Sequence, residues 1–339
     1  MFYIHQTKCI SAQLTWNTIN LNELQLSQNN ILPAKEPSYD SIPPAMFRRM
    51  GKAVRLSSGA ALPLLHQQTF NGIVIGTANG GLEDCIKFLN QIIQYEEGRL
   101  TPTNFVQSTT NAIASQLAFF SANKGHNSTH VHRGLAFENA LLEVAMLLTE
   151  HPQNNYLAGG VDEISAYQNN IELLSGSYKK EEILNTNLYT SNTPGSIPGE
   201  GCVMFALNKV KENATAHVKA ISTLHSEKEE DVLQHLKDFI KDNPIDLILS
   251  GEGGDNRFTH FYTAVETVLP NKTIARFKHL CGEYTTASSF ALWFACSILQ
   301  TNNIPAHALK KEGANKPYKN ILIYNNYMGK QHSFMLVTV

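Results

Sequence analysis

Residues 126–148 read HNSTHVHRGLAFENALLEVAMLL. The first part, residues 128–133, alternates polar and β-branched side chains as a strand does, and Gly134 follows it. From Leu135 to Leu148, apolar residues recur at helical spacing. The pattern predicts a strand, a sharp turn and a helix, so the turn residues lie at a helix N-terminus. Unpaired N–H groups and the helix dipole favour a thiolate or an oxyanion at such a point.

Enzymes place a nucleophile in a turn of this kind, because the helix N-terminus lowers its pKa. This turn holds Arg133 and Gly134; it contains no Cys, and no Ser or Thr follows Arg133 in it. The sequence therefore predicts the architecture of a nucleophile site without its nucleophile.

Composition describes an ordinary globular chain of 339 residues, with 42% apolar and 17% charged residues. The net charge of -2 gives no argument for nucleic acid or an anionic membrane surface. No run approaches the ~18 apolar residues that a bilayer span needs, and the opening MFYIHQTKCI does not resemble a signal peptide. Scattered cysteines without a CxxC pair favour a reducing cytoplasm over disulfides or a zinc ribbon; they are Cys9, Cys85, Cys202, Cys281 and Cys296.

Buried strand patterns alternate with helical ones along the chain, which predicts an α/β fold with buried sheets. A strand, a loop and an apolar helix follow one another in each half, which indicates a duplicated unit. Residues 165–196 are polar and irregular, and we interpret them as an excursion or cap. The strand patterns lie at residues 71–77, 155–160, 199–207, 246–250 and 320–324.

A basic segment, residues 42–65, begins with two prolines and predicts a helix. Its cations are a solvated helix face or, alternatively, a docking patch for an acidic partner. They are Arg48, Arg49, Lys52 and Arg55.

Three histidines, His126, His130 and His132, cluster in the predicted strand and turn. By the two-residue period of a strand, His130 and His132 lie on one face. Imidazoles bind metals, but no carboxylate or Cys completes a known ligand spacing here. We therefore expect no metal, and we expect these side chains to line an interface or a pocket, hydrogen-bonded to backbone.

An ordered set of segments over nearly the whole chain resembles the β-ketoacyl synthases of the thiolase-like fold. The resemblance implies one compact domain with αβαβα layers, divided into halves at residues 1–207 and 208–339, with 165–196 as the cap. The segments are FRRMGKAVR at 47–55, TPTNFVQSTTNAIASQLA at 101–118, the turn at Gly134, LAGGVDE at 157–163, PGEGCVMFAL at 198–207, LSGEGGD at 249–255 and FKHLCGEYTTAS at 277–288.

The residues that carry chemistry in this family are replaced. The family's cysteine falls within residues 130–134, and counting back from the glycine pair at 159–160 places it at Gly134. Its first histidine lies in a loop that matches residues 250–255, where Gly251 or Glu252 stands instead. Its second histidine matches Glu283, and its lysine is retained as Lys278. An anion at 283 would oppose the enolate that condensation builds.

This pattern resembles the catalytically silent partner of a synthase heterodimer, called a chain-length factor, and most closely those of aryl polyene and flexirubin-type pigment clusters. The resemblance implies no cofactor, an active β-ketoacyl synthase as partner, and an acidic acyl carrier protein that docks on the basic segment. It also places residues 128–133 at the dimer interface, with His130, His132 and Arg133 lining that interface or the acyl tunnel crossing it.

Two alternatives remain open at this stage. Glu252, Asp255 and Glu283 could share a proton and run acid–base chemistry on an acyl thioester, as in a hydrolase or dehydratase; otherwise Glu283 forms an ion pair with Lys278 or Arg133. The second alternative is a homodimer that holds an acyl chain without chemistry. Cys281 as a substitute nucleophile is disfavoured, because a nearby carboxylate opposes its thiolate.

Overall fold

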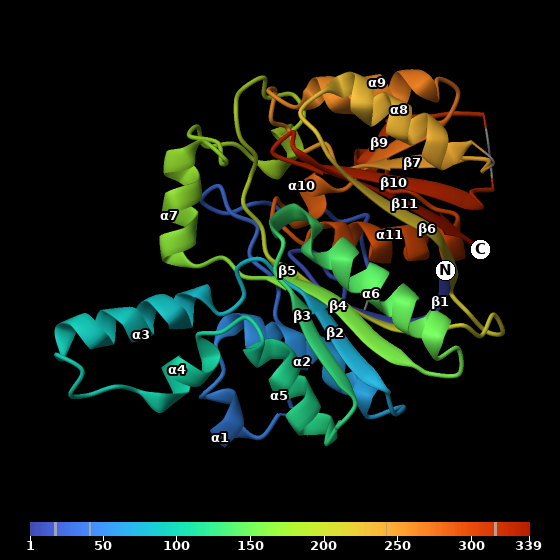
Figure 1. Ribbon diagram of the computed structural model, residues 1–339. Coiled ribbons are helices and arrows are strands. Elements are labelled where there is room, and N and C mark those ends of the chain that lie inside the picture. Colours follow the sequence, from blue (N-terminus) through green and yellow to red (C-terminus); the bar gives the residue numbers. More distant parts are fainter. Residues whose placement is uncertain (17–18, 41, 242, 315–316) are drawn as a thin grey trace.

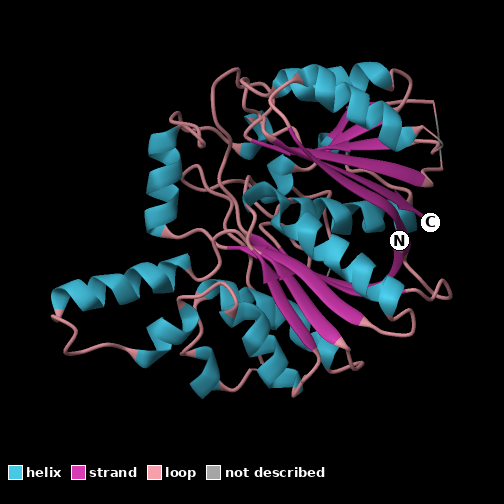
Figure 2. Cartoon of the chain, viewed as in Figure 1, coloured by secondary structure: helices cyan, strands magenta, loops and turns pink. Residues whose placement is uncertain are grey.

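The computed structural model describes residues 1–16, 19–40, 42–241, 243–314 and 317–339. Within them, the strands form an eleven-stranded sheet in the order β3-β2-β4-β5-β1-β6-β11-β10-β7-β8-β9. Figure 2 shows that the strands lie in two stacked groups, with helices between and outside them. The strands are β1 Phe2–Ile10, β2 Gly72–Gly76, β3 His126–His130, β4 Tyr156–Asp162, β5 Gly201–Asn208, β6 Ala216–His225, β7 Leu247–Ser250, β8 Thr273–Arg276, β9 Leu309–Lys311, β10 Asn320–Tyr327 and β11 Gln331–Thr338.

Strand pairing repeats between the two groups. In the first, β2 pairs in parallel with β3 and β4, while β4–β5 and β5–β1 are antiparallel. In the second, β7 pairs in parallel with β8 and β10, while β10–β11 and β11–β6 are antiparallel. The groups meet where β1 pairs with β6 through Phe2, Tyr3 and Ile4. The predicted α/β fold with duplicated halves is confirmed.

The helices complete five layers (Figure 1). Helices α6 and α11 lie between the two groups of strands, α2 and α5 cover the first group from outside, and α8 and α9 cover the second. Helices α3 and α4 project to one side, and α7 stands beside the sheets. The helices are α1 Pro44–Phe47, α2 Lys52–Leu65, α3 Leu82–Gln94, α4 Pro102–Gln107, α5 Ala112–Ser121, α6 Ala136–Glu150, α7 Ala166–Ser175, α8 Glu229–Ile240, α9 Thr259–Val268, α10 Lys278–Cys281 and α11 Ser288–Thr301, with 3₁₀ turns η1 Arg133–Leu135, η2 Asn185–Asn187 and η3 Ala306–Ala308.

The central layer forms the main core. Helix α11 is apolar on nearly all sides, as a helix buried on all faces must be, and its Phe290, Trp293 and Phe294 are buried. They share one apolar cluster with Phe137 of α6, Phe2 of β1 and residues from both groups of strands. Among the described residues, no helix is both long enough and apolar enough to cross a membrane.

Three local predictions need correction. The strand predicted at residues 128–133 is β3, His126–His130, and residues 131–135 form the turn. The helix predicted over residues 42–65 is interrupted between α1 and α2, because Gly51 has the extended backbone of an N-cap. The segment 165–196, predicted to be irregular, contains α7, whose Ser165 side chain caps its first turn.

Candidate functional site

The turn before α6 is closed by the hairpin between β10 and β11. Arg133 has a φ of 48°, a left-handed conformation that costs on the order of 1–3 kcal/mol for a non-glycine residue. The Gly134 N–H donates to Gln331 Oε1 at 3.1 Å. A Cβ on Gly134 would lie 2.2 Å from Tyr327 Cβ, so Tyr327 occupies the space that any side chain at 134 would need. The turn is present as predicted, and it is sealed.

Arg133 lies beside the same tyrosine. Burial raises the pKa of the Tyr327 phenol, and the hydrogen bond from Arg133 only partly opposes this effect. The predicted pocket residue Arg133 thus contacts the hairpin of the second half rather than Glu283.

The two residues predicted at the family's lysine and second histidine positions form an ion pair. Lys278 is fully buried, and its Nζ lies 2.5 Å from Glu283 Oε1. Burial raises the pKa of Glu283, and Lys278 lowers it in part. The ion pair considered for Glu283 is therefore the one with Lys278.

Glu252 belongs to a different ion cluster. Its carboxylate contacts Lys310 at 2.7 Å and Arg276 at 3.8 Å. Lys310 in turn reaches Glu266 at 2.8 Å. The structure therefore places Glu252 and Glu283 in separate ion pairs, which removes the geometric basis for one proton shared between them.

A pocket of roughly 70 Å³ lies beside the sealed turn. Glu283, Asp255 and Tyr327 line it, together with Tyr178 and Ser196 from the segment 165–196. A pocket of this size holds a few waters or a small ligand rather than a long acyl chain.

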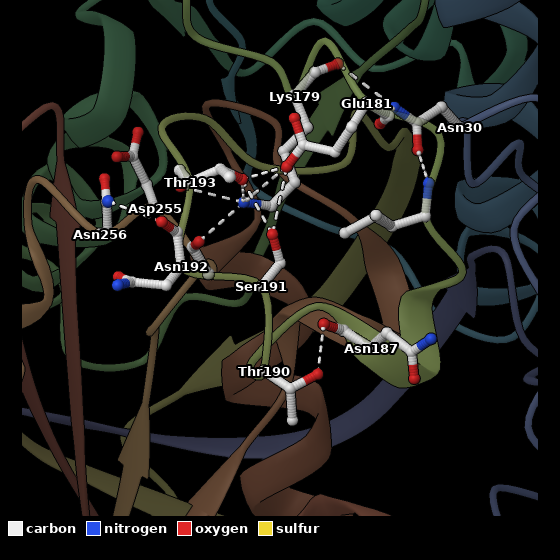
Figure 3. Close-up of polar contacts among 12 residues, drawn as sticks. Asn30, Lys179, Glu181, Asn187, Thr190, Ser191, Asn192, Thr193, Asp255 and Asn256 are labelled. Carbon is white, nitrogen blue, oxygen red and sulfur yellow. Dashed lines mark hydrogen bonds and ion pairs between the residues drawn. The ribbon is translucent and has the colours of Figure 1, made fainter.

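The segment 165–196 is held against the loop after β7 by a buried lysine. Lys179 Nζ donates to Thr193 O at 3.0 Å, to Thr193 Oγ1 at 2.9 Å and to Gly254 O at 3.0 Å. Figure 3 shows these contacts, with Glu181 beside Thr193 and Asn30 bonded to the backbone of the same segment. This arrangement positions one wall of the pocket.

Asp162, at the end of β4, supports another wall, and sequence reasoning did not single it out. One of its oxygens accepts the backbone N–H groups of Ala78 and Asn79, each at 2.9 Å. The other accepts the hydroxyls of Thr285 and Thr286 at 2.6 and 2.8 Å. The available signal was its position directly after a buried glycine-containing strand, where parallel strands place polar groups.

The three histidines have partners in α6. His126 and His130 both contact Glu143 of α6, at 2.8 and 2.6 Å, and Ser128 donates to the same carboxylate. His132 lies in the turn, and its Nδ1 is 3.0 Å from Asn139 Nδ2. The prediction that His130 and His132 share a strand face is wrong, because β3 ends at His130; the partners are side chains rather than backbone.

The basic segment divides into two pairs. Lys52 contacts the buried Glu200 at 2.6 Å. Arg55 donates two hydrogen bonds to Glu36, of 2.6 and 2.7 Å. Arg48 and Arg49 are exposed. The surface available to an acidic partner is therefore smaller than the four predicted residues.

Two further buried groups bear on the site. Cys281 is fully buried and burial raises the pKa of its thiol, which argues against a thiolate nucleophile there. Glu138, in the first turn of α6, is also fully buried. Burial raises the pKa of Glu138, while Ser333 and Ser288 lower it in part.

Known proteins share this fold. Residues 23–165 match the family model "Beta-ketoacyl synthase, N-terminal domain". No curated protein matches the chain. A β-ketoacyl synthase from Burkholderia phymatum STM815 superposes with a TM-score of 0.77 at 14% identity, covering 99% of this chain and 98% of that one.

Two similar structures are complexes. A chain of the ishigamide ketosynthase/chain length factor has a TM-score of 0.79 at 10% identity, over 100% of this chain and 98% of that chain. A chain of the ketosynthase ApeO with its chain length factor ApeC, from Xenorhabdus doucetiae, has a TM-score of 0.77 at 12% identity, over 100% and 98%. The chain therefore has the thiolase-like fold of the ketosynthases, and its residues 23–165 match their N-terminal domain.

Proposed function

We propose that this chain is a non-catalytic, ketosynthase-like subunit that pairs with an active β-ketoacyl synthase, in the manner of a chain-length factor. The observation that carries the proposal is the sealed turn before α6, where Tyr327 leaves no space for a side chain at Gly134. Condensation also needs a group that stabilises an enolate. Glu283 instead brings a carboxylate to the position of the family's second histidine. Its ion pair also neutralises Lys278, the residue that matches the family's lysine.

The partner surface that we propose includes strand β3. This strand lies at one edge of the sheet, and among the described strands it pairs with β2 alone. An edge strand presents unpaired N–H and C=O groups to a second strand. Val131, directly after β3, is 54% exposed although apolar, and Met146 of α6 is 61% exposed. These exposed apolar side chains next to a free strand edge support a subunit interface that also bounds an acyl tunnel.

The experiment is co-expression with the synthase encoded nearest to this chain, then size exclusion and an assay with malonyl-loaded carrier protein. The proposal expects a one-to-one complex and chain extension that needs both proteins but is retained in Glu283→Gln. A homodimer that turns over a thioester alone would contradict it. A homodimer that copurifies with a lipid and has no turnover would favour the acyl-binding alternative instead.

Carrier-protein docking on Arg48 and Arg49 is the second part of the proposal. Both are exposed, whereas Lys52 and Arg55 are held by Glu200 and Glu36. We expect the Arg48→Glu/Arg49→Glu pair to weaken carrier binding at low salt, since the carrier surface is acidic. The matched control is Lys237→Glu/Lys241→Glu, at exposed positions in and after α8. Equal affinities for the two pairs would remove the docking claim.

The setting that we propose is the cytoplasm, in fatty-acid-like biosynthesis of an aryl polyene or flexirubin-type pigment. The likeness of the sequence around residues 130–141 to proteins of such clusters supports it. Mass spectrometry of the product released by the reconstituted complex tests this assignment, because an aromatic polyene product would support it and a saturated acyl product would exclude it.

A further inference from the structure

The pocket beside the sealed turn has aromatic walls. Phe258, Tyr178, Tyr262, Tyr284 and Tyr327 all line it. Their ring faces carry partial negative charge, which attracts cations. Among the described residues that line the pocket, none is Lys, Arg or His.

Carboxylates complete the lining, and they differ in how fully they are satisfied. Asp162 accepts hydrogen bonds on both oxygens from the two loops that it joins. Asp255 is paired with Arg257 at 2.5 Å. Among the described residues, Glu172 accepts from neutral groups of its own segment, Ser177 at 2.6 Å, Gln168 at 3.1 Å and Ser175 at 3.4 Å. Glu172 therefore has no cationic partner among the described residues.

Glu283 faces the same space with its second oxygen. Its Oε1 is held by Lys278, whereas its Oε2 lies 3.0 Å from the point where a Cβ on Gly253 would be. Ser196 Oγ lies 3.3 Å from that point. Glu172 and Glu283 both raise the pKa of Tyr178, after the larger effect of burial. Glu172, Glu283 and Tyr178 all line the pocket.

Unsatisfied polar atoms on the pocket wall provide a second, independent observation. Ser196 is 3% exposed, and its hydroxyl has no hydrogen-bond partner among the described residues. Glu163 is 6% exposed, and its Oε1 also lacks a partner there, while its Oε2 accepts from Ala53 N. Both residues line the pocket. Buried polar atoms without partners are costly, which indicates that a bound group satisfies them.

We propose that this pocket binds a small organic ammonium ion. The cation lies against the aromatic walls and between Glu172 and Glu283, and its N–H groups donate to Ser196 Oγ and to the carboxylate oxygens. The same walls repel a carboxylate ligand such as a malonyl group. The proposal does not rest on the pairing with a synthase, because every group named belongs to this chain.

The test is calorimetric titration of the full chain with n-propylammonium chloride, with 1-propanol and sodium propionate as the neutral and anionic matches. We expect heat from the ammonium ion alone, and affinity about tenfold weaker in Glu172→Gln and in Glu283→Gln, as expected when one of two charges is removed. Glu230→Gln, an exposed position on α8, is the matched control and should bind as the parent does.

A pair of variants at Tyr327 separates binding from folding. Tyr327→Phe keeps a ring face and should retain affinity, whereas Tyr327→Leu should lose it, with near-ultraviolet circular dichroism showing that both are folded. Equal binding of propanol, or unchanged affinity in both Gln variants, would overturn the proposal. If sodium chloride reduced the heat of ammonium binding equally in the parent and in the Gln variants, that result would also overturn the proposal. Because the titration uses this chain alone, its failure leaves the synthase pairing untouched.

Discussion

Gly134 is the residue whose environment most restricts what this site can do. A Cβ there would meet Tyr327 Cβ at 2.2 Å and Cγ at 2.6 Å, and Tyr327 is the last residue of β10, where it pairs with Gln331 of β11. A cysteine placed at position 134 by one substitution therefore cannot form a nucleophile site unless the β10–β11 hairpin moves. The loss of function that we propose is a property of two halves that pack together, not of one missing atom.

We predict that Gly134→Ala lowers the free energy of unfolding by about 1–3 kcal/mol, the usual cost of overpacking a closed site. Urea denaturation measures it. The control is Gly98→Ala at an exposed position, where a Cβ would meet Tyr95 O at 3.2 Å, and we expect a change of under about 1 kcal/mol there. Equal stability of the parent and Gly134→Ala would show that Tyr327 yields easily.

Glu163 makes a second prediction at this scale, through pH. Burial raises its pKa to about 7, and Asp84 and Glu200 add to the shift. A carboxyl group whose pKa is raised by folding contributes its full stability below its ordinary pKa, and that contribution is lost as the pH rises toward about 7.

We therefore expect the free energy of unfolding of Glu163→Gln, relative to that of the parent, to rise by about 2 kcal/mol as the pH increases from about 5 to about 8. The amide oxygen of Gln can still accept from Ala53 N, so the N-terminus of α2 keeps its cap. Urea denaturation at several pH values provides the curve, and Glu150→Gln on the exposed end of α6 is the control. A difference that does not vary with pH would contradict the shift.

Part of the candidate site could be predicted from the sequence. An ion pair of Glu283 with Lys278 or Arg133 was among the expected alternatives, and the structure shows the pair with Lys278. Glu252 was not separable from Glu283 by sequence, since its partners Arg276 and Lys310 come from β8 and β9. Asp162 was missed for the same reason, because its role exists only once two distant loops meet.

At the scale of elements, strand β3 is attached to α6 through one carboxylate. His126, Ser128 and His130 point to the same side of the strand and all contact Glu143. Burial alone would raise the pKa of Glu143, but these three hydrogen bonds together lower it. The edge strand is thereby fixed against the central helix before any partner binds, which suits a surface that must present a strand in one register.

We predict that Glu143→Ala speeds amide hydrogen exchange of β3 in the isolated chain by about tenfold, while exchange in β4 is unchanged. Because the pKa of Glu143 is lowered by folding, its contribution is present above its ordinary pKa and is lost as the pH falls through the lowered value. The difference between parent and variant should therefore shrink in acid. Equal exchange in β3 of the two proteins at neutral pH would show that Glu143 does not hold the strand.

The predicted boundaries of an element were wrong where a single residue changes the backbone conformation. The apolar pattern of residues 42–65 is continuous, yet Gly51 separates α1 from α2. The Gly51 N–H donates to the side chain of Gln107, and the Ala53 N–H donates to the side chain of Glu163. Those acceptors lie far away in sequence, so periodicity alone could not reveal the break. Helix α6, whose apolar pattern from Leu135 to Leu148 is long and uninterrupted, is observed at Ala136–Glu150.

At the scale of the whole molecule, the two halves share one core. The main apolar cluster contains Phe2, Phe137 and Phe205 from the first half and Phe290 and Met335 from the second. The first half also carries the turn at Gly134, and the second half closes it with Tyr327 and Gln331. Helices α6 and α11 each contact strands of both groups. Neither half could therefore bury its own apolar faces without the other half.

We therefore predict that the halves do not fold separately. Residues 1–211 and 212–339, divided in the exposed loop between β5 and β6, should each lack cooperative unfolding. Mixed from denaturant, they should form a one-to-one complex whose near-ultraviolet circular dichroism matches that of the intact chain. Calorimetry of the intact chain should show one transition, because exposing the shared core is a single event. A half that unfolds cooperatively by itself would mean that β1 and β6 join two independent domains, and the closure of the site by the second half would then be a docking equilibrium rather than part of the fold.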